Sequence, residues 1–379
     1  MVERGMTAAL QLPAVRAVGH RYSHGHLLAH PTQVTPGDVP AIVVPTVRNP
    51  ATMRDSMLLA RELQRPMIAL CSRWSSAEVV RKQAQLLDAP VVAVDVTDQA
   101  KLPNFSCDTL LAAEKKLNRA NDVSIKRNLG LSVARMLRWQ RIAFLDDDLT
   151  GLRPEAIRAA GGLLSDYNVS AMRNVGFPDN SVVCHARREV GLPQDVFVGG
   201  GAMAVRVNAR TPFFPTVYNE DWLFLVGRRN VEQVAVHGRV TQEPYDPYLS
   251  PERARSEEFG DCLAEGLFSL SEHERPMQAA DERFWRAFLD NRVAMIDEIL
   301  ARLDRSRPDE RRTRIIQALK VARGRCQIID PAFCVRYLTA WQADLDVWKR
   351  FQAGLPRHAD PVAAFAALGL KAYVHLPAT

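Results

Sequence analysis

The sequence has no long apolar run and only a few cysteines. None of its apolar runs approaches the roughly 18 residues that a membrane-spanning helix needs. Charged residues and prolines interrupt residues 1–21, so this stretch is not a continuous apolar segment of the secretory kind. The 6 cysteines form no C-x-x-C pair, which argues against a disulfide framework or a zinc site. We therefore expect a cytoplasmic protein with reduced thiols and no transmembrane segment.

The chain also lacks a strong excess of charge of one sign. It has 49 basic and 43 acidic residues, a net charge of +6 that is spread along the sequence. This charge is too diffuse to predict a nucleic-acid partner, although it suits an anionic small molecule such as a nucleotide. The hydrophobic fraction of 47% is that of an ordinary globular protein. At 379 residues, the chain is long enough for about two domains.

Residues 1–37 are rich in histidine, proline and glycine, and they predict a flexible leader. The histidines at positions 20, 24, 26 and 30 raise the question of a metal site. No cysteine or carboxylate nearby in the sequence completes such a site, so a flexible polar arm is the better interpretation.

From residue 38 to 245, short apolar runs alternate with helical patterns. This alternation predicts an α/β domain with a mostly parallel central sheet covered on both faces. In such sheets, ligands bind at the carboxyl ends of the strands. We expect strands at 41–44, 67–70, 91–94 and 142–145, and helices at 52–63, 78–87 and 124–137.

The chain beyond residue 160 divides into three parts. Residues 161–240 are irregular, with short strands expected at 182–183, 196–198 and 202–207. Prolines among charged residues predict a linker or lid over 246–280. Apolar residues at helical spacing then predict an α-helical subdomain over 281–379, through which the chain could form a homo-oligomer. The expected helices of this subdomain cover 282–303, 311–323 and 331–351.

Three consecutive carboxylates, Asp146, Asp147 and Asp148, follow the apolar run at 142–145. Adjacent anions repel one another, so a strand seldom ends this way without a counter-charge. In an extended backbone Asp146 and Asp148 point to the same side and Asp147 to the other. Such a pair can hold Mg²⁺ or Mn²⁺, which typically bridges carboxylates to substrate phosphates. The alternative is a solvated turn.

A basic pair, Lys126 and Arg127, stands about 20 residues before this triplet, at the start of an expected helix. Cations and backbone N–H groups near a helix start can bind phosphate. The alternative is a solvated helix face.

Four motifs in this order resemble the family 2 glycosyltransferases of the GT-A fold. They are Pro45-Thr46 at the end of the first strand, Arg127-Asn128-x-Gly130, Asp146-x-Asp148, and Glu220-Asp221 before Trp222. The resemblance covers about residues 40–245. It implies a GT-A-type nucleotide-sugar-binding domain.

The resemblance also implies an activity, the transfer of a sugar from a UDP- or GDP-linked donor to a hydroxyl acceptor. Mg²⁺ or Mn²⁺ would neutralise the leaving diphosphate, held by Asp148 together with Asp146. Asp221, beside Glu220, would be the general base, and the transfer would invert the anomeric centre. The implied donor-binding set is Pro45, Thr46, Arg48, Ser72, Arg127, Asn128, Asp146, Asp147, Gly200 and Trp222.

Members of the family usually have an aspartate that reads the base at the end of the second strand, where this chain has Ser72 after Cys71. A late histidine often completes the metal site, and His237 is the candidate, although Gln242 has the better spacing. The glycines at 199–201 allow close approach of the sugar to the backbone, or else form a bulge.

Two other function classes stay open from the residues alone. Asp146-x-Asp148-x-Thr150 also resembles the first motif of haloacid-dehalogenase-like phosphatases, in which Asp146 would be a nucleophile beside Mg²⁺. Gly260-Asp261, followed by Glu265, is similar to their late acidic motif, but the charged residues 253–259 before it do not predict a strand. A nucleotide-binding protein without turnover is the third class.

Overall fold

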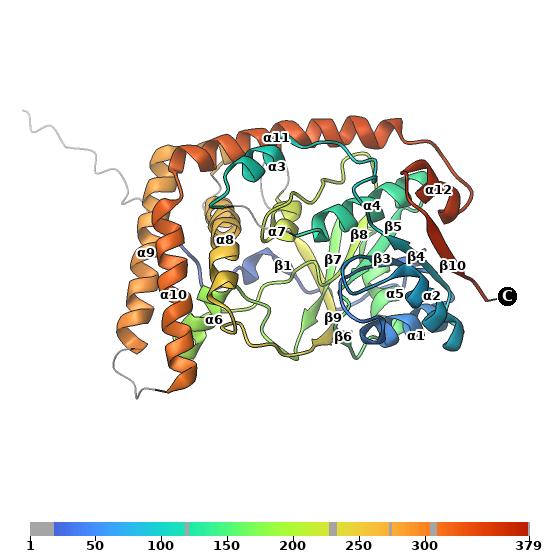
Figure 1. Ribbon diagram of the computed structural model, residues 1–379, viewed down its shortest axis with the longest axis horizontal. Helices are drawn as coiled ribbons and strands as arrows, with labels where there is room; N and C mark the ends of the chain where they lie inside the picture. The colour runs from blue at the N-terminus through green and yellow to red at the C-terminus, as the bar shows by residue number, and fades with distance from the viewer. Residues whose placement is uncertain (1–18, 118–120, 227–232, 273–274, 304–308, 378–379) are drawn as a thin grey trace, which may run out of the picture.

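The computed structural model describes residues 19–117, 121–226, 233–272, 275–303 and 309–377. A 10-stranded sheet occupies one side of the molecule, and long helices occupy the other side and the top (Figure 1). The strand order is β1-β9-β7-β8-β5-β2-β3-β4-β10, and β6 pairs with β9. The strands are β1 Leu28–Ala29, β2 Ile42–Thr46, β3 Met67–Cys71, β4 Val91–Asp95, β5 Arg141–Leu145, β6 Leu149–Thr150, β7 Val169–Asn174, β8 Ala202–Arg206, β9 Val234–Gln242 and β10 Ala372–His375.

The sheet is mostly parallel, which confirms the predicted α/β class. β2 pairs in parallel with β3 and β5, and β3 pairs in parallel with β4. β8 runs antiparallel to β5, so that Ala202 at its start lies opposite Leu145 at the end of β5. The carboxyl ends of β2, β3 and β5 and the beginning of β8 therefore meet at one edge of the sheet.

Both faces of the sheet are buried because successive strand residues alternate between two apolar cores. In β2, Val43 packs in one core with α4, while Ile42 and Val44 pack in the other with α1 and α2. The helices of this part are α1 Arg54–Leu63, α2 Ala77–Leu86, α3 Ser106–Ala113, α4 Val123–Met136, α5 Pro154–Leu163, α6 Val182–Glu189 and α7 Glu220–Leu225.

The segment expected as a linker or lid, 246–280, contains a long helix instead. This helix, α8 Pro251–Glu272, begins at a proline and is buried at every residue from 257 to 270. Two of its acidic residues are buried beside arginines, one on the same helix and one further along the chain. Arg253 pairs with Glu257 at 2.8 Å, and Arg292 pairs with Glu258 at 2.8 Å.

Three further helices follow α8 as expected, but the chain then returns to the sheet. They are α9 Glu282–Leu303, α10 Glu310–Ile328 and α11 Pro331–Gly354. After α11, which crosses the top of the molecule in Figure 1, the short helix α12 Pro361–Ala367 leads to β10. β10 pairs antiparallel with β4, so the last part of the segment 281–379 belongs to the sheet.

Two short strands expected from apolar residues are wrong. Residues 182–183 open helix α6, because the hydroxyl of Ser181 accepts a hydrogen bond from the Cys184 N–H and caps the helix start. Residues 196–198 pair with no strand. Short apolar runs of this kind fit a buried helix or loop as well as a strand.

The expected leader is in part a packed segment, although residues 1–18 lie outside the described ranges. The side chains of His20 and His24 are each 3% exposed, and both reach Glu265 of α8, at 3.4 and 3.2 Å. The carboxylate missing from the local sequence thus comes from a helix 241 residues further along. Among the described helices, none combines the length and the apolar character needed to cross a membrane.

Candidate active site

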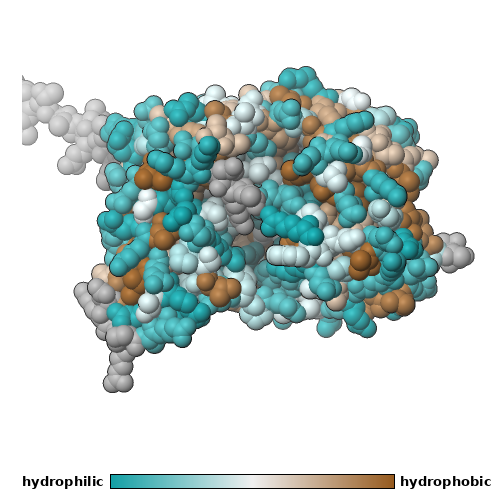
Figure 2. All heavy atoms as spheres, viewed as in Figure 1, coloured by the Kyte–Doolittle hydropathy of each residue, from teal (hydrophilic) through white to brown (hydrophobic). Residues whose placement is uncertain are grey.

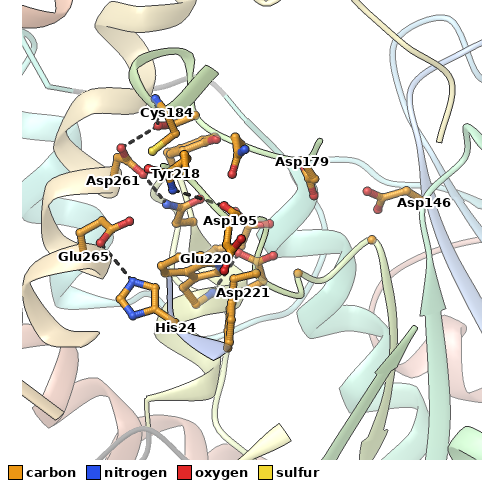
Figure 3. A pocket seen from close by; sticks show the side chains of 18 of the residues that line it. His24, Asp146, Asp179, Cys184, Asp195, Tyr218, Glu220, Asp221, Asp261 and Glu265 are labelled. Carbon is orange, nitrogen blue, oxygen red and sulfur yellow. Dashed lines mark hydrogen bonds and ion pairs between the residues drawn. The ribbon is translucent and has the colours of Figure 1, made fainter. Parts of the chain in front are cut away.

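A cavity of about 250 Å³ lies between the carboxyl edge of the sheet and helix α8. Residues that the sequence singled out from three separate motifs line it together: Arg127, Asp146, Glu220, Asp221 and Trp222. Figure 3 shows Asp146 at one end and Asp261 and Glu265 at the other. In the space-filling view the surface is hollowed between the C-terminal helices and the sheet, with mostly hydrophilic residues around the hollow (Figure 2).

Asp147, the middle carboxylate of the triplet, is an anchor for the end of β2. One of its oxygens accepts hydrogen bonds from the Thr46 hydroxyl at 2.8 Å and from the backbone N–H groups of Val47 and Arg48 at 3.2 and 3.3 Å. The other oxygen pairs with the Arg48 guanidinium. Both oxygens are therefore engaged, so the structure does not place Asp147 where a donor would bind it. Thr46 is likewise buried beneath the site.

Asp148 has the features of a cation ligand. It is 8% exposed, and its Oδ1 has no hydrogen-bond partner among the described residues. The other oxygen, Oδ2, lies 3.0 Å from Arg48 and 3.4 Å from the amide of Gln242. Burial and the charge of Asp146 raise the pKa of Asp148 to about 6. A buried carboxylate oxygen without a partner is costly, and a divalent cation would satisfy it.

A second, smaller space of about 20 Å³ adjoins Asp146. Asp146, Asp179 and Gln242 are among the residues that line it. Its volume suits one water molecule or one ion. The unpartnered oxygen of Asp148 and the small space beside Asp146 therefore fit a cation with oxygen ligands, such as Mg²⁺ or Mn²⁺.

Asp146 is joined to the catalytic candidates through Arg127. The guanidinium of Arg127 lies 3.2 Å from Asp146 and 2.5 Å from Glu220. Burial raises the pKa of Asp146, and the Arg127 charge offsets part of this shift. Glu220 therefore neutralises a buried arginine, whereas Asp221, which lines the same cavity, accepts hydrogen bonds from backbone N–H groups.

Lys126, the other cation of the basic pair, is not available to bind phosphate and does not lie on a solvated helix face. It is 1% exposed, and its ammonium donates to the Thr46 carbonyl at 2.8 Å and the Ser72 hydroxyl at 2.7 Å. Ser72 in turn donates to Asp122 at 2.5 Å, and Asp122 pairs with Lys126 at 3.1 Å. Burial lowers the pKa of Lys126, and the Asp122 charge opposes this. Ser72 thus lies at the carboxyl edge of the sheet, as predicted. There Lys126 connects the end of β2, through the Thr46 carbonyl, to the end of β3, through the Ser72 hydroxyl.

Asn128 does not reach the site, contrary to its expected role in donor binding. Its side chain is buried, and its amide donates to the Phe214 carbonyl and accepts from the Phe214 N–H, both at 2.8 Å. Asn128 thus replaces a strand partner for the backbone at Phe214.

Each glycine of the run 199–201 allows one charged side chain to approach the backbone. A Cβ at Gly199 would lie 2.8 Å from an oxygen of Asp221, and one at Gly201 would lie 2.9 Å from an oxygen of Asp146. A Cβ at Gly200 would lie 2.5 Å from the guanidinium of Arg127. The charges of the site converge here because these three residues lack side chains.

Asp221 is held in one orientation by backbone N–H groups. One oxygen accepts from Gly200 at 2.5 Å, and the other accepts from Trp222 at 2.9 Å. The turn that places it begins at Asn219, whose φ of 58° is left-handed. Each oxygen keeps one lone pair for a substrate hydroxyl.

Trp222 lies beside Asp221 in the cavity wall and belongs to an aromatic cluster. Its ring centroid lies 5.2 Å from that of Phe197, 4.5 Å from that of Phe268 and 5.4 Å from that of His24. His24 itself pairs with Glu265, so the N-terminal segment and α8 form the far wall of the cavity.

His237 does not reach the carboxylates. It lies on β9, while Gln242, five residues further along, stands opposite Leu149 and contacts Asp148. At about 3.3 Å per strand residue, His237 lies roughly 15 Å from Gln242. The structure thus brings Gln242, not His237, to the expected metal site.

Asp179 is a site residue that the sequence did not reveal. It follows Pro178 in the irregular segment after β7, where no periodicity or motif distinguishes it. Asp179 is an exposed residue whose side chain lines the cavity, and desolvation there together with the charges of Asp221 and Asp146 raises the pKa of its carboxyl to about 7. Figure 3 shows Asp179 beside Asp146 at the same end of the cavity.

The late acidic motif expected for a phosphatase is not at the site of Asp146. Asp261 lies on the buried helix α8, where it pairs with Arg292 and accepts from the Ser181 hydroxyl at 2.8 Å. In Figure 3 it stands at the opposite end of the cavity from Asp146. Asp261 therefore cannot share a cation with Asp146 in this fold.

No family model and no curated protein matches the sequence. Among solved structures, a mannosyltransferase from Pyrobaculum calidifontis in complex with GDP-Man and Mn²⁺ is similar over 86% of this chain and 88% of that chain, at 12% identity and a TM-score of 0.37. Mouse xyloside xylosyltransferase 1 in its apo form is similar over 44% of this chain and 67% of that chain, at 17% identity and a TM-score of 0.27. At TM-scores this low, neither likeness decides the function of this chain.

Proposed function

We propose that this chain is a metal-dependent glycosyltransferase with a GT-A-type domain. It would move a sugar from a nucleotide diphosphate sugar, UDP- or GDP-linked, to a hydroxyl acceptor. The observation that carries the proposal is the pairing of two features in one place. Asp146 and Asp148 end a parallel strand with a buried, unpartnered oxygen, and Asp221 faces the cavity that begins at Asp146.

In this proposal Asp146 and Asp148 hold the cation, Mg²⁺ or Mn²⁺. The bound cation would neutralise the charge that develops on the leaving diphosphate. Arg48 already lies beside Asp148, and its side chain is 48% exposed, so it can turn to the diphosphate when the donor arrives. The nucleobase of the donor would lie along the edge formed by Pro45 and Ser72, where the strands β2 and β3 end.

Asp221 would accept the proton of the acceptor hydroxyl. The N–H groups of Gly200 and Trp222 hold its carboxylate in place, so little reorganisation is needed when the hydroxyl arrives. Because Asp146 and Asp221 line the same cavity, the acceptor oxygen and the leaving oxygen can lie on opposite sides of the anomeric carbon. This arrangement supports single displacement with inversion.

Thermal shift with a panel of ligands tests the proposal. UDP, GDP, UDP-glucose and GDP-mannose are each added to the wild type with and without Mn²⁺ and with Mg²⁺. We expect one nucleotide to raise the melting temperature only when a cation is present. The variant Asp148→Ala should lose this rise, and Asp98→Ala, which removes an exposed carboxylate from a loop, should keep it.

The contrary outcome is specific. If no nucleotide changes the melting temperature, and a phosphomonoester is hydrolysed by the wild type but not by Asp146→Asn, the chain is a phosphatase. If a nucleotide sugar binds with the cation and its sugar is never released or transferred, the chain binds without turnover.

A further inference from the structure

Asp179 lies between the proposed cation ligand Asp146 and the proposed general base Asp221 in the wall of the site. It lines both the large cavity and the small space beside Asp146. Asp146 shares both spaces with it, and Asp221 shares the large one. A group that lies between Asp146 and Asp221 in the large cavity therefore has the carboxyl of Asp179 in the same wall.

Gly199 keeps this space open between Asp179 and Asp221. An oxygen of Asp221 lies 2.8 Å, and an oxygen of Asp179 3.5 Å, from the point where a Cβ at residue 199 would stand. The two carboxyls thus face one gap that no side chain fills. The gap is polar on both sides, so its occupant must offer hydrogen-bond donors to carboxylate oxygens.

The two carboxyls differ in what already holds them. Asp221 accepts hydrogen bonds from two backbone N–H groups, those of Gly200 and Trp222. The Asp179 side chain accepts none from the residues that the structure describes. The carboxylate of Asp221 is therefore held in one orientation, while the oxygens of Asp179 are available to a ligand.

We propose that Asp179 binds hydroxyls of the transferred sugar and thereby selects the donor. This inference rests on the proposed function, because it takes Asp146 and Asp148 as the diphosphate end and Asp221 as the acceptor end. The sugar ring must then lie between these ends. A carboxylate accepts hydrogen bonds from two neighbouring hydroxyls at once, and it distinguishes epimers because only one of them directs both hydroxyls toward it.

The test compares a nucleotide with its own nucleotide sugar. Calorimetry in the presence of Mn²⁺ measures the binding of GDP and GDP-mannose, and of UDP and UDP-glucose, to the wild type, Asp179→Asn and Asp179→Ala. We expect both variants to bind the nucleotide within about twofold of the wild type. Their affinity for the nucleotide sugar should fall roughly ten- to a hundredfold, as expected for lost hydrogen bonds to a charged group.

The matched control is Asp195→Asn. Asp195 lines the same cavity, and its backbone N–H contacts Tyr22 of the N-terminal segment, so the variant removes the same charge from a different wall. Its affinity for the nucleotide sugar should stay within about twofold of the wild type. Equal losses in Asp195→Asn and Asp179→Asn would reduce the effect to the net charge of the cavity and overturn the proposal.

Other outcomes also decide. A parallel loss of nucleotide and nucleotide-sugar affinity in Asp179→Asn would make Asp179 part of the cation site. Unchanged nucleotide-sugar affinity would remove it from sugar binding. If the wild type binds no nucleotide at all, the proposed function itself fails.

Epimers of the donor sugar give a second measurement. If the wild type prefers GDP-mannose over GDP-glucose, or UDP-glucose over UDP-galactose, the Asp179→Asn variant should lack that preference.

Discussion

Each of the three adjacent carboxylates at the end of β5 has a different environment in the folded chain. Asp147 is bonded to Thr46 and Arg48, and Asp146 is paired with Arg127. Asp148 is buried with one oxygen that has no partner among the described residues. Three like charges can stand side by side because Arg127 pairs with Asp146, Arg48 pairs with both Asp147 and Asp148, and the unpartnered oxygen of Asp148 has the place for a cation.

Asp221→Asn tests the role of the general base. The amide cannot accept a proton, so transfer should fall by roughly a hundred- to ten-thousandfold. The affinity for the nucleotide diphosphate should stay close to that of the wild type, because Asp221 lies at the other side of the gap. The measurement is the rate of sugar transfer beside calorimetry of the nucleotide. A large loss of nucleotide affinity would place Asp221 in the donor site instead.

Arg127→Met tests the buried arginine. The variant leaves the buried Glu220 and the partly exposed Asp146 without their cation, and removing one partner of a buried ion pair costs about 3–5 kcal/mol. Urea unfolding measures the loss. The control is Arg65→Met, in which an exposed pair with Asp38 is broken and the loss should be about 0–1 kcal/mol. Similar values for the two variants would show that the Arg127 network adds little to stability.

At the scale of elements, the strand ends and helix starts place the site. The antiparallel pairing of β8 with β5 brings Gly201 to Asp146, whose N–H donates to the Gly201 carbonyl at 2.8 Å. Helix α7 begins directly after the left-handed Asn219 and presents Glu220 and Asp221 to the same backbone. The loop 199–201 is thus the common surface on which α4, β5 and α7 meet.

Gly200→Ala tests this loop. The new methyl group would lie 2.5 Å from the Arg127 guanidinium, which its two ion pairs prevent from moving away. We expect a loss of about 1–3 kcal/mol in the free energy of unfolding and a loss of transfer activity. The matched control is Gly324→Ala on helix α10, where nothing lies within 4 Å of the new Cβ and a helix former replaces glycine. It should be neutral or stabilising; a neutral Gly200→Ala would contradict the close packing.

At the scale of the whole molecule, the N-terminal segment and the C-terminal helices complete a cavity that the sheet only begins. His20 and His24 reach Glu265 on α8, and this contact closes the far wall beside Trp222. Burial alone would raise the pKa of Glu265, but His20, His24 and Arg292 lower it to about 2. The ion cluster is thus a long-range connection between the two parts of the chain.

Glu265→Gln tests this connection through its dependence on pH. Because the folded state lowers the pKa of Glu265, the carboxylate stabilises the fold above the unfolded pKa of about 4.5, and this contribution is lost as the pH falls toward 2. At pH 6 the variant should be less stable than the wild type by about 3 kcal/mol, the free energy that the lowered pKa of Glu265 represents. Urea unfolding between pH 2.5 and 6 should show this difference shrink as the pH falls. A difference that is constant over this range would assign the effect to packing.

The strands and helices of the sheet domain can largely be predicted from the local sequence pattern. The ion-pair partners of its charged residues cannot. Apolar runs at 41–44 and 142–145 predicted β2 and β5 because a buried parallel strand is apolar on both faces. The charged segment at 253–259 was interpreted as part of a linker, although it lies on buried helix α8, because the sequence does not show that Arg292 will reach Glu258. Asp179 escaped notice for a similar reason, since a loop residue has no period.

The sequence by itself determined the alternation of strands and helices, the carboxylates at the end of β5 and the acidic pair at 220–221. These features are local, and local backbone preference and the spacing of apolar residues are enough to produce them. Only the tertiary structure decided that Arg127 pairs with Asp146 and with Glu220, which lies 93 residues after Arg127. It also decided that Asp179 and Asp221 lie on either side of the gap at Gly199. Which charges meet depends on how distant elements pack, because buried charges are stable only beside the partners that packing brings to them.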